Sequence, residues 1–274
     1  MKIKFQKYHG CGNDFIIGPY IEGTDYPSLA RKVCNRFTGI GADGLLLAKE
    51  ENGRIEMVFY NSDGSRAPMC GNGIRCFSLY CLDKGLVSGN IFPIDTLSGE
   101  MIVEVKQREP YICKVCLGEP DFSSKRLDID TDEETFLNKN IELEKYGRVN
   151  VDAVYMATHH LVVLVDDLDK AINSSLAYEL GSYSTFTKGI NVNLVEIIDK
   201  DNIRMKTFER GAGWTCACGT GASASYVIMR LKNLCNEKVK IHLQYGEIVV
   251  SSKENKVYME GPSVCIARNI SINL

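Results

Sequence analysis

The feature that most constrains this chain is a short element that occurs twice. Residues 70–73 (CGNG) and 218–221 (CGTG) each follow a strand-like run and a turn, and each precedes apolar residues at helical spacing. Asn61 and Glu209 lie nine residues before the two cysteines, each at the end of its strand-like run. An internal duplication explains this alignment, and a pseudo-twofold between the copies would bring the two helix starts to face each other across a cleft.

Two domains are also expected from the size of the chain, because 274 residues exceed what one hydrophobic core usually supports. The composition turns polar and acidic between Glu119 and Asn150, without a clear apolar period, and the second domain should begin near the start of this stretch. We interpret the stretch itself as a solvated surface segment with one short helix.

Periodicity and turn signals predict a mixture of strands and helices. Helices are expected over residues 27–36, from 74 to 81 with a stop at Gly85, around 171–180 and beyond residue 221. Strands are expected at residues 3–7, 15–17, 45–47, 55–60, 102–105, 111–117, 161–165, 191–198 and 205–208.

Charge and hydropathy narrow the class of partner. The 35 acidic residues nearly cancel the 32 basic ones, so the net charge of -3 provides no basic field for nucleic acid or anionic lipid. The N-terminal segment lacks a secretory apolar core, and the longest aliphatic run, residues 161–165, is too short to span a membrane. We therefore expect a cytoplasmic protein that acts on a small molecule, without a nucleic-acid or membrane partner.

The chain has 11 cysteines, an odd number scattered along its length, and reduced thiols are a simpler interpretation than a disulfide scaffold. Cys113 and Cys116 have the spacing of a redox or zinc pair. They lie in a strand-like pattern, however, where residues three apart point to opposite faces. No second Cys or His pair accompanies them, so we expect no metal site.

A cysteine at the start of a helix has distinctive chemistry. Unpaired N–H groups and the positive end of the helix dipole favour a bound carboxylate and a thiolate, and the following glycines allow a ligand to approach the backbone. If Cys70 and Cys218 flank one carbon, a thiolate removes a proton while the opposite thiol delivers another, and the configuration inverts. The α-carbon of an amino acid suits this chemistry, with backbone dipoles stabilising the carbanion. No lysine lies in a recognisable cofactor motif, so we expect no pyridoxal phosphate and no other cofactor.

Other interpretations of the two cysteines remain open. They could form a dithiol that shuttles to a disulfide, or each could be a buried structural cysteine that follows a turn. The chain could also be an amino-acid-binding protein without turnover. Cys216, next to Cys218 in this pattern, could be an accidental neighbour or a resolving thiol.

Six segments of the chain resemble the diaminopimelate epimerase family, in the family's order and over nearly the whole chain. They are residues 9–15 (HGCGNDF), 39–44 (GIGADG), 61–65 (NSDGS), 69–76 (MCGNGIRC), 209–213 (ERGAG) and 217–221 (ACGTG). The resemblance implies a cofactor-independent racemase or epimerase of α+β class, with two pseudo-symmetric domains that each wrap a strand-rich, barrel-like sheet around a central helix. It implies an N-terminal domain of residues 1–117 plus 263–274, to which the last strand returns, and a C-terminal domain of residues 118–262. It also implies an active site in the cleft between the domains and a homodimer.

The resemblance assigns roles to individual residues. Cys70 and Cys218 match the catalytic cysteines of the family. The residues that match its substrate contacts are Asn13, Asn61, Asn191, Glu209 and Arg210, and those that match its holders of the α-carboxylate are Gly71, Asn72, Gly219 and Thr220. A bidentate Arg210 suits a second carboxylate at the far end of the substrate.

Two positions depart from the family pattern. Where the family has Gly-Asn-Pro-His, residues 157–160 read Ala-Thr-His-His, so Thr158 replaces an amide, and Trp214 stands where the family has Glu. These changes alter the hydrogen bonds available to a substrate, and we take His159, His160 and Trp214 as candidate specificity residues. The added rings favour a shift to an aromatic or heterocyclic amino acid, with histidine as the leading expectation and diaminopimelate as the alternative.

Overall fold

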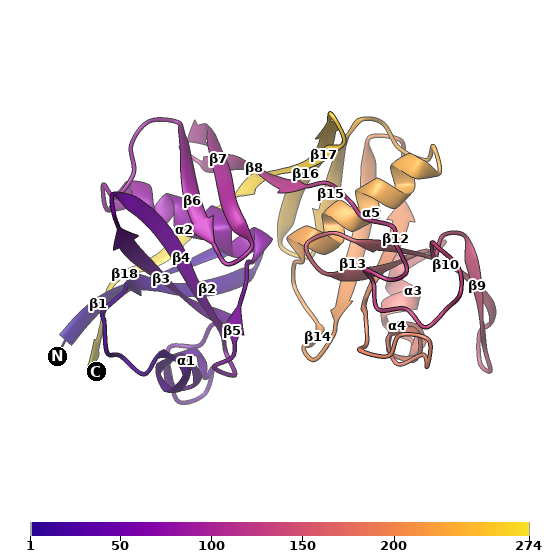
Figure 1. Cartoon of the computed structure of the whole chain (residues 1–274), viewed down its shortest axis with the longest axis horizontal. Helices are drawn as coiled ribbons and strands as arrows, with labels where there is room; N and C mark the ends of the chain where they lie inside the picture. The colour runs from indigo at the N-terminus through magenta and orange to yellow at the C-terminus, as the bar shows by residue number, and fades with distance from the viewer. Residues whose placement is uncertain (1, 274) are drawn as a thin grey trace. The chain divides into compact units, whose positions relative to one another are not determined.

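The computed structural model describes residues 2–273, which form two compact units rich in strands (Figure 1). Unit 1 comprises Met1–Cys116 and Glu260–Leu274, and unit 2 comprises Leu117–Met259. The return to unit 1 begins at Glu260, three residues before the expected position, because a strand crosses the boundary there. The combination of long strands and a few helices places the fold in the α+β class, as predicted.

The first elements in chain order are β1 (Lys2–Gly10), β2 (Asn13–Pro19), α1 (Tyr26–Cys34), β3 (Gly44–Glu51), β4 (Arg54–Asn61), β5 (Arg66–Ala67), α2 (Gly71–Asp83), β6 (Ile91–Thr96), β7 (Gly99–Arg108) and β8 (Tyr111–Gly118). They are followed by β9 (Lys139–Leu143), β10 (Gly147–Tyr155), β11 (His159–Leu164), α3 (Leu168–Ile172), α4 (Leu176–Gly181), β12 (Asn191–Ile197), β13 (Asn202–Glu209), β14 (Gly213–Trp214), α5 (Gly219–Leu231), β15 (Lys238–Leu243), β16 (Gly246–Lys253), β17 (Lys256–Pro262) and β18 (Val264–Asn273). Strand β18 pairs antiparallel with β1, so the segment after unit 2 returns to the sheet that contains β1.

The strand pairing of unit 1 is repeated in unit 2. In unit 1, β2 is parallel to β3, β3 is antiparallel to β4, β4 is parallel to β6, and β6 is antiparallel to β7. In unit 2 the same sequence of relations joins β11 to β12, β12 to β13, β13 to β15, and β15 to β16. The short strands β5 and β14 pair with β4 and β13 at matching places. The predicted duplication is therefore confirmed at the level of topology.

Each unit holds one long helix against its strands (Figure 1). Helix α2 packs on β1, β2 and β3, and helix α5 packs on β10 to β13 and on β16. Both helices have 13 residues, and ten residues of each are buried. Because a helix buried on most of its surface cannot carry a broad charged face, the small and apolar composition of α5 follows from its position.

The shorter helices cover the outer faces of the sheets. Helix α1 begins after Asp25, whose carboxylate accepts a hydrogen bond from the Ser28 N–H, and it packs on β3 and β4. The single helix expected over residues 171–180 is two short helices, α3 and α4. The hydroxyl of Ser174 donates to the Ala171 carbonyl and accepts from the Leu176 N–H, and this local bonding ends one helix and starts the next.

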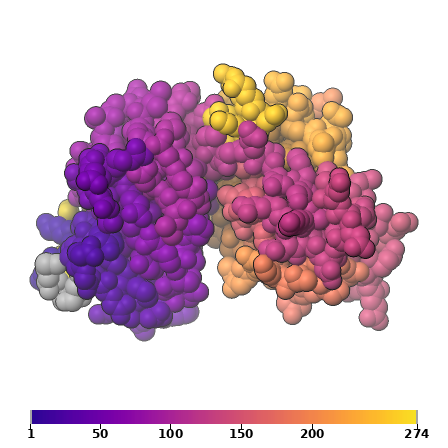
Figure 2. All heavy atoms as spheres, in the orientation of Figure 1, coloured from indigo at the N-terminus to yellow at the C-terminus, as the bar shows by residue number. Residues whose placement is uncertain are grey.

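The polar segment between Glu119 and Asn150 differs from the expectation in one respect. It contains no α-helix and instead forms β9 and the first residues of β10, joined by a hairpin. In β9, Ile141 and Leu143 are buried and Asn140 and Glu142 are exposed. The sequence therefore contains the alternation of apolar and polar residues that is typical of a strand, but only over a few residues. Figure 2 shows atoms of this segment spread over the face of unit 2 that is turned to the viewer, in keeping with the predicted surface position.

Candidate active site

Cys70 and Cys218 occupy the same position at the start of the long helix of their unit. Each is the N-cap residue with an extended backbone, and its Sγ accepts a hydrogen bond at 3.3 Å from the N–H three residues later, Gly73 in α2 and Gly221 in α5. The preceding N–H groups of the first turn have no acceptor within the helix. Each unit therefore combines a sulfur with backbone donors suited to a carboxylate.

In unit 1, strand ends bring the predicted residues to the start of α2. Asn13 begins β2 and Asn61 ends β4, and β3 between them pairs Gly44 with both Phe15 and Asn61. The Asn13 Oδ1 atom lies 3.8 Å from Cys70 Sγ and accepts a hydrogen bond at 3.1 Å from the Asn72 side chain. The topology alone thus gathers four of the predicted residues: Asn13, Cys70, Gly71 and Asn72.

Asn13 is held by a network of charged side chains. Its Nδ2 donates to Asp43 at 2.5 Å, and Arg36 bridges Asp43 and Asp14 at 2.7 Å to each. Lys7 completes the network with an ion pair to Asp14 at 2.9 Å. Burial opposes ionisation of Asp14, but the hydrogen bonds from Arg36 and Lys7 outweigh it and leave the pKa of this carboxyl below its ordinary value.

Asn61 lies at the base of a polar turn. Its amide donates to the Ser65 hydroxyl at 3.0 Å, and the Asp63 carboxylate accepts from both the Ser65 N–H and its hydroxyl. The Ser62 N–H donates to the Asp43 carbonyl, so the turn rests on the same segment that holds Asn13.

In unit 2 the same arrangement of strand ends surrounds the start of α5. His160 near the start of β11 pairs with Asn191 at the start of β12, and Glu209 ends β13. The Nε2 atom of His160 lies 3.1 Å from Thr220 Oγ1, and Thr220 Oγ1 lies 3.5 Å from Cys218 Sγ. Gly219 and Thr220 are the first two residues of the helix, so their N–H groups point out of it beside the sulfur.

His160 is fully buried, which changes the role expected of it. Burial lowers the pKa of its imidazole to about 3, with a smaller contribution from the neighbouring His159, so the ring is neutral near neutral pH. Asn193 donates to its Nδ1 at 3.1 Å, and Thr207 donates to the Asn193 Oδ1 at 2.9 Å. His160 is therefore held inside unit 2, where its Nε2 contacts Thr220 at the start of α5.

Glu209 and Arg210 are adjacent in the hairpin between β13 and β14. Glu209 accepts a hydrogen bond from the Thr215 hydroxyl at 2.6 Å, and the Arg210 N–H donates to the Asn191 Oδ1 at 2.9 Å. One nitrogen of the Arg210 guanidinium donates to the carbonyls of Lys188 and Gly189. Within residues 2–273 no carboxylate forms an ion pair with Arg210, so its remaining N–H groups are available to a bound anion.

Thr158 lies in the turn before β11, and His159 is the first residue of that strand. The turn is closed by a hydrogen bond from the Met156 N–H to the Thr158 carbonyl, with Ala157 at a positive φ of 59°. The His159 Nε2 lies 3.8 Å from the Asp128 carboxylate, which Lys188 also contacts at 3.0 Å. Burial and the nearby charge of Arg210 lower the pKa of His159, and Asp128 opposes them. His159 is thus mostly packed against its own chain.

Trp214 also has partners within unit 2. Its ring meets Phe208 edge-on, with centroids 5.3 Å apart, and Phe208 meets Tyr178 edge-on at 6.3 Å. The indole is 37% exposed. This aromatic row joins the hairpin that carries Glu209 and Arg210 to helix α4.

The remaining cysteines differ from the two at the helix starts. All 11 lie within residues 2–273, and none forms a disulfide. Burial raises the pKa of Cys34 and Cys76 to about 12 and that of Cys235 to about 11, which keeps these thiols protonated. In β8, Cys113 is buried and Cys116 is half-buried on the opposite face, as predicted.

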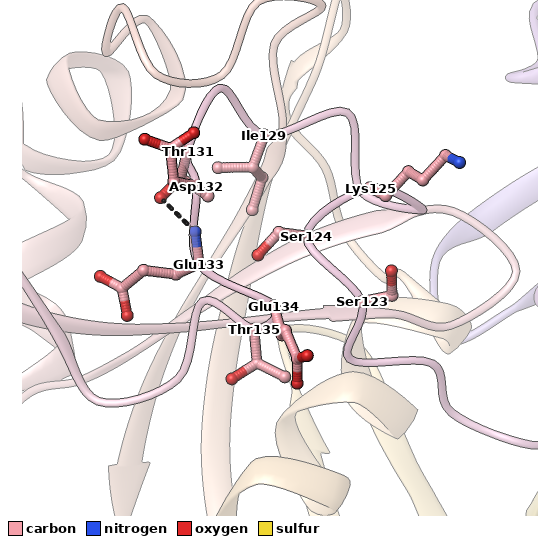
Figure 3. Close-up of a pocket in the computed structure, with 9 residues that line it drawn as sticks. All are labelled: Ser123, Ser124, Lys125, Ile129, Thr131, Asp132, Glu133, Glu134 and Thr135. Atoms are coloured by element: carbon pink, nitrogen blue, oxygen red, sulfur yellow. Dashed lines mark hydrogen bonds between the residues drawn. The ribbon is translucent and has the colours of Figure 1, made fainter.

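Two hollows of the surface lie away from these residues. The first, of about 640 Å³, is lined by Ser123, Ser124, Lys125, Ile129, Thr131, Asp132, Glu133, Glu134 and Thr135 (Figure 3). The second, of about 670 Å³, is in unit 1 and is lined by Lys4, Pro19, Tyr20, Glu22, Ala48, Lys49, Glu50, Ile55, Tyr80, Lys84 and Leu86. Neither hollow contains a predicted site residue, so the sulfurs and strand ends define the candidate site.

Metal-ligand clusters and membrane-spanning helices are both absent from the described residues 2–273. No group of three or more His, Cys, Asp or Glu side chains is arranged to hold a metal ion. No helix in this range is both long and apolar enough to cross a membrane.

Four supporting residues escaped the sequence analysis. They are Asp43, Arg75, Asn193 and Thr207. Asp43 lies in the GIGADG segment, and Asn193 follows Asn191 by two residues on the same face of β12, so each had a neighbouring signal. Arg75 lies in the MCGNGIRC segment, but a charged residue is ordinarily assigned to the surface and this one is fully buried.

Comparison with known sequences gives a consistent result over nearly the whole chain. A family model described as "Diaminopimelate epimerase" matches residues 5–123 and 152–266. A protein named diaminopimelate epimerase from Caldanaerobacter subterraneus subsp. tengcongensis is 37% identical over 264 residues, which cover 94% of this chain and 96% of that protein. Another of the same name, from Alkaliphilus metalliredigens, is 36% identical over 285 residues, with 100% and 99% covered.

Solved structures with the same fold have more distant sequences. A phenazine biosynthesis protein of the PhzF family from Bacillus anthracis is similar with a TM-score of 0.73 at 14% identity, over 100% of both chains. A probable proline racemase from Agrobacterium radiobacter K84 gives a TM-score of 0.72 at 16% identity, over 99% of this chain and 93% of that one. At such low identity the similarity shows the fold alone.

Proposed function

The chain belongs to the diaminopimelate epimerase family of isomerases, which act on amino acids without pyridoxal phosphate, and we propose that it epimerises diaminopimelate between its LL and meso forms. Cys70 and Cys218 act as the two bases in this proposal. One removes the α-proton while the other donates a proton to the opposite face of the same carbon.

The observation that carries the proposal is the matched pair of capped helices. Two thiols, one from each copy of a duplicated unit, have the same N-cap geometry and the same 3.3 Å bond from a backbone N–H. Inversion at a stereocentre needs an acid and a base of equal competence, because the reaction runs in both directions. A duplicated cysteine site supplies this equivalence.

The helix starts also supply stabilisation of the carbanion. In this proposal the N–H groups of Gly71, Asn72, Gly219 and Thr220, each in the first turn of its helix, bind the α-carboxylate, onto which the negative charge of the carbanion spreads. Asn13, bonded to Asn72 and next to Cys70, contacts the same end of the substrate.

The far end of diaminopimelate carries a second ammonium group and a second carboxylate, and the protein must bind both. Arg210 offers N–H groups without an ion-pair partner among residues 2–273, which suits the distal carboxylate. Asn61, Thr158, Asn191 and Glu209 are the further substrate contacts of this proposal. A Thr158 hydroxyl in place of an amide keeps one hydrogen-bonding group at its position.

Histidine, the substrate expected from the added rings, finds no support. The relatives at 36–37% identity carry the name diaminopimelate epimerase. The rings behind the expectation are also engaged within unit 2, since His160 is buried, His159 is mostly packed and Trp214 meets Phe208. Diaminopimelate, formerly the alternative, is therefore the substrate that we propose.

We also retain the homodimer as part of the proposal. Strand β18 exposes Val264 and Ile266, an apolar strip at the edge of the sheet in unit 1. Light scattering on the eluted protein should give twice the chain mass of 30.5 kDa, and a monomer mass at micromolar concentration would contradict this part.

Proton exchange in heavy water tests the proposed function directly. LL- and meso-diaminopimelate, histidine and a panel of other amino acids are incubated with the protein in D2O, and loss of the α-proton signal is followed by NMR. The proposal predicts exchange and interconversion of the two diaminopimelate isomers. Exchange of histidine alone would restore the earlier expectation, and no exchange in the whole panel would reject an amino-acid epimerase.

A further inference from the structure

The two sulfurs accept equivalent backbone bonds but face different side-chain partners. Cys70 Sγ lies 3.8 Å from the Asn13 Oδ1, and Cys218 Sγ lies 3.5 Å from the Thr220 hydroxyl. An oxygen that can only accept favours a protonated thiol, whereas a hydroxyl that donates favours a thiolate. The direction of the hydrogen bonds behind each partner therefore determines which form each site prefers.

In unit 1 the direction is set by groups with only one possible role. Asp43 has a carboxylate, which accepts from the Asn13 Nδ2 at 2.5 Å. Arg75 has only donors, and it donates to the Asn72 Oδ1 at 3.0 Å, so the Asn72 Nδ2 is left to donate to the Asn13 Oδ1 at 3.1 Å. Both constraints turn the oxygen of Asn13 towards Cys70, where it accepts a hydrogen bond from the thiol.

In unit 2 the chain of bonds runs in the opposite direction. The Leu161 carbonyl can only accept, and the Asn193 Nδ2 donates to it at 3.0 Å, which orients that amide. The same Nδ2 faces His160 Nδ1 at 3.1 Å, so Nδ1 accepts and Nε2 carries the proton. His160 Nε2 then donates to Thr220 Oγ1 at 3.1 Å, and the hydroxyl proton of Thr220 is directed to Cys218 Sγ.

The charged groups around each partner agree with this difference. Behind Asn13 stands the carboxylate of Asp43, which disfavours a second negative charge nearby, while Arg36 and Arg75 reduce its effect. Behind Thr220 stands His160, a neutral ring, with the uncharged Asn193 and Thr207 beyond it. The hydrogen bonds that lead from His160 through Thr220 to Cys218 are donated by uncharged groups.

We propose that Cys218 is the thiolate and Cys70 the thiol in the resting enzyme. The inference rests on the proposed function, since it sets the starting state of the two-base reaction. The first turnover breaks the substrate C–H bond on the side of Cys218, forms S–H there, and leaves the electron pair on the α-carbon. That pair takes the proton of Cys70, so the enzyme ends with a Cys70 thiolate and a Cys218 thiol. Exchange of these protons with water restores the resting state.

Alkylation of the substrate-free full chain tests the assignment. Iodoacetamide reacts with thiolates, so the rate at each cysteine is followed by peptide mass spectrometry from pH 5 to pH 10. The pH midpoint of each profile reports ionisation without depending on how easily the reagent reaches the sulfur. We expect the midpoint of Cys218 to lie about one pH unit or more below that of Cys70. Equal midpoints, or a lower midpoint at Cys70, would overturn the proposal.

Substitution of Thr220 tests the cause of the difference. Thr220→Val removes the donor while keeping the shape, and it should raise the Cys218 midpoint towards that of Cys70, with Thr220→Ser restoring it. An unchanged midpoint in a folded Thr220→Val variant contradicts the assigned chain of bonds. If this variant does not fold, the comparison of the two wild-type midpoints still decides the matter. These measurements need no substrate, so failure of the D2O panel would reject the function without altering their outcome.

Discussion

The starts of α2 and α5 share one backbone design and differ in the side chains that support it. The carbonyl of the first helical residue accepts a bond from Arg75 in unit 1, at 3.3 Å, and from the Ser223 hydroxyl in unit 2, at 3.0 Å. Arg75 and Ser223 both lie five residues after their cysteine, and both are fully buried. A charged network of Asp14, Arg36, Asp43 and Lys7 thus corresponds to a neutral network centred on His160. Duplication has kept the geometry that the proposed two-base reaction needs and allowed the surroundings of each sulfur to diverge.

Removal of either sulfur should have the largest effect on activity, because it leaves only one of the two helix starts with a thiol. Cys70→Ala and Cys218→Ala should each lower epimerisation by about a thousandfold or more, because each variant lacks the acid or the base of one face. Each should still exchange the α-proton of one diaminopimelate isomer, and the two variants should differ in which isomer that is. NMR in D2O measures both properties.

Cys216→Ala provides the matched control, since this half-buried thiol lies two residues from Cys218 and has no assigned role. It should keep wild-type rates. Full epimerisation by either single variant of the helix-start cysteines would remove the basis for the two-base assignment.

The two glycines whose N–H groups donate to the sulfurs, Gly73 and Gly221, differ in the space around them. A Cβ on Gly221 would lie 2.3 Å from the Asn193 Oδ1 and 2.9 Å from the Thr207 hydroxyl, whereas a Cβ on Gly73 would meet nothing closer than 3.1 Å. Gly221→Ala should therefore lower the free energy of unfolding by about 2–3 kcal/mol through overpacking. In Gly73→Ala the gain in helix propensity offsets the crowding, and the change should stay within about 1 kcal/mol. Urea unfolding of both variants checks the contrast, and equal losses would contradict it.

Lowering the pH should reduce the free energy of unfolding of unit 2, because His160 is buried as a neutral ring. The folded pKa of about 3 lies below the ordinary 6.5, so the unfolded chain binds the proton first. The contribution of His160 to stability is full above pH 6.5 and falls by about 1.4 kcal/mol per pH unit as the pH drops towards 3. His160→Gln should lack this slope between pH 6.5 and 4.5, measured by urea unfolding at each pH. His242→Gln, which changes a partly exposed ring, is the control, and an equal slope in wild type and His160→Gln would refute the expectation.

Trp214→Phe should give the smallest effect. The ring of phenylalanine keeps the edge-on contact with Phe208, so stability should change by less than about 1 kcal/mol. Rates with diaminopimelate should stay within about threefold of wild type, because the substitution leaves Glu209 and Arg210 in place. A large rise in KM would instead show that the indole itself contacts the substrate. The corresponding turn of unit 1 is held by polar bonds among Asn61, Asp63 and Ser65.

Local patterns in the sequence predicted the parts of the fold that depend on local chemistry. The repeated CGxG element indicated two helix starts, and the structure confirms a cysteine N-cap at each. Glycine turns and alternating apolar residues located nine of the 18 strands within residues 2–273. The sequence analysis expected a short helix where β9 and β10 form a hairpin, and one helix where α3 and α4 are separate. Both predictions were wrong because each feature depends on only a few residues with weak periodicity.

The support behind each sulfur could not be predicted in the same way. Asn13 and Asp43 are 30 residues apart, and His160 and Asn193 are 33 apart, so their contacts appear only when strands β2, β3, β11 and β12 are placed. The burial of His160 could not be predicted for the same reason. A histidine beside a polar turn looks exposed until the burial of its strand is known.

The pairing of β18 with β1 has a consequence for synthesis of the protein in the cell. A ribosome that has released the chain as far as Met259 has exposed all of unit 2, but unit 1 still lacks its closing strand. Unit 2 is therefore complete first, and unit 1 waits for the synthesis of β18. A premature stop before β18 would leave β1 with a bare edge, open to pairing with another nascent chain.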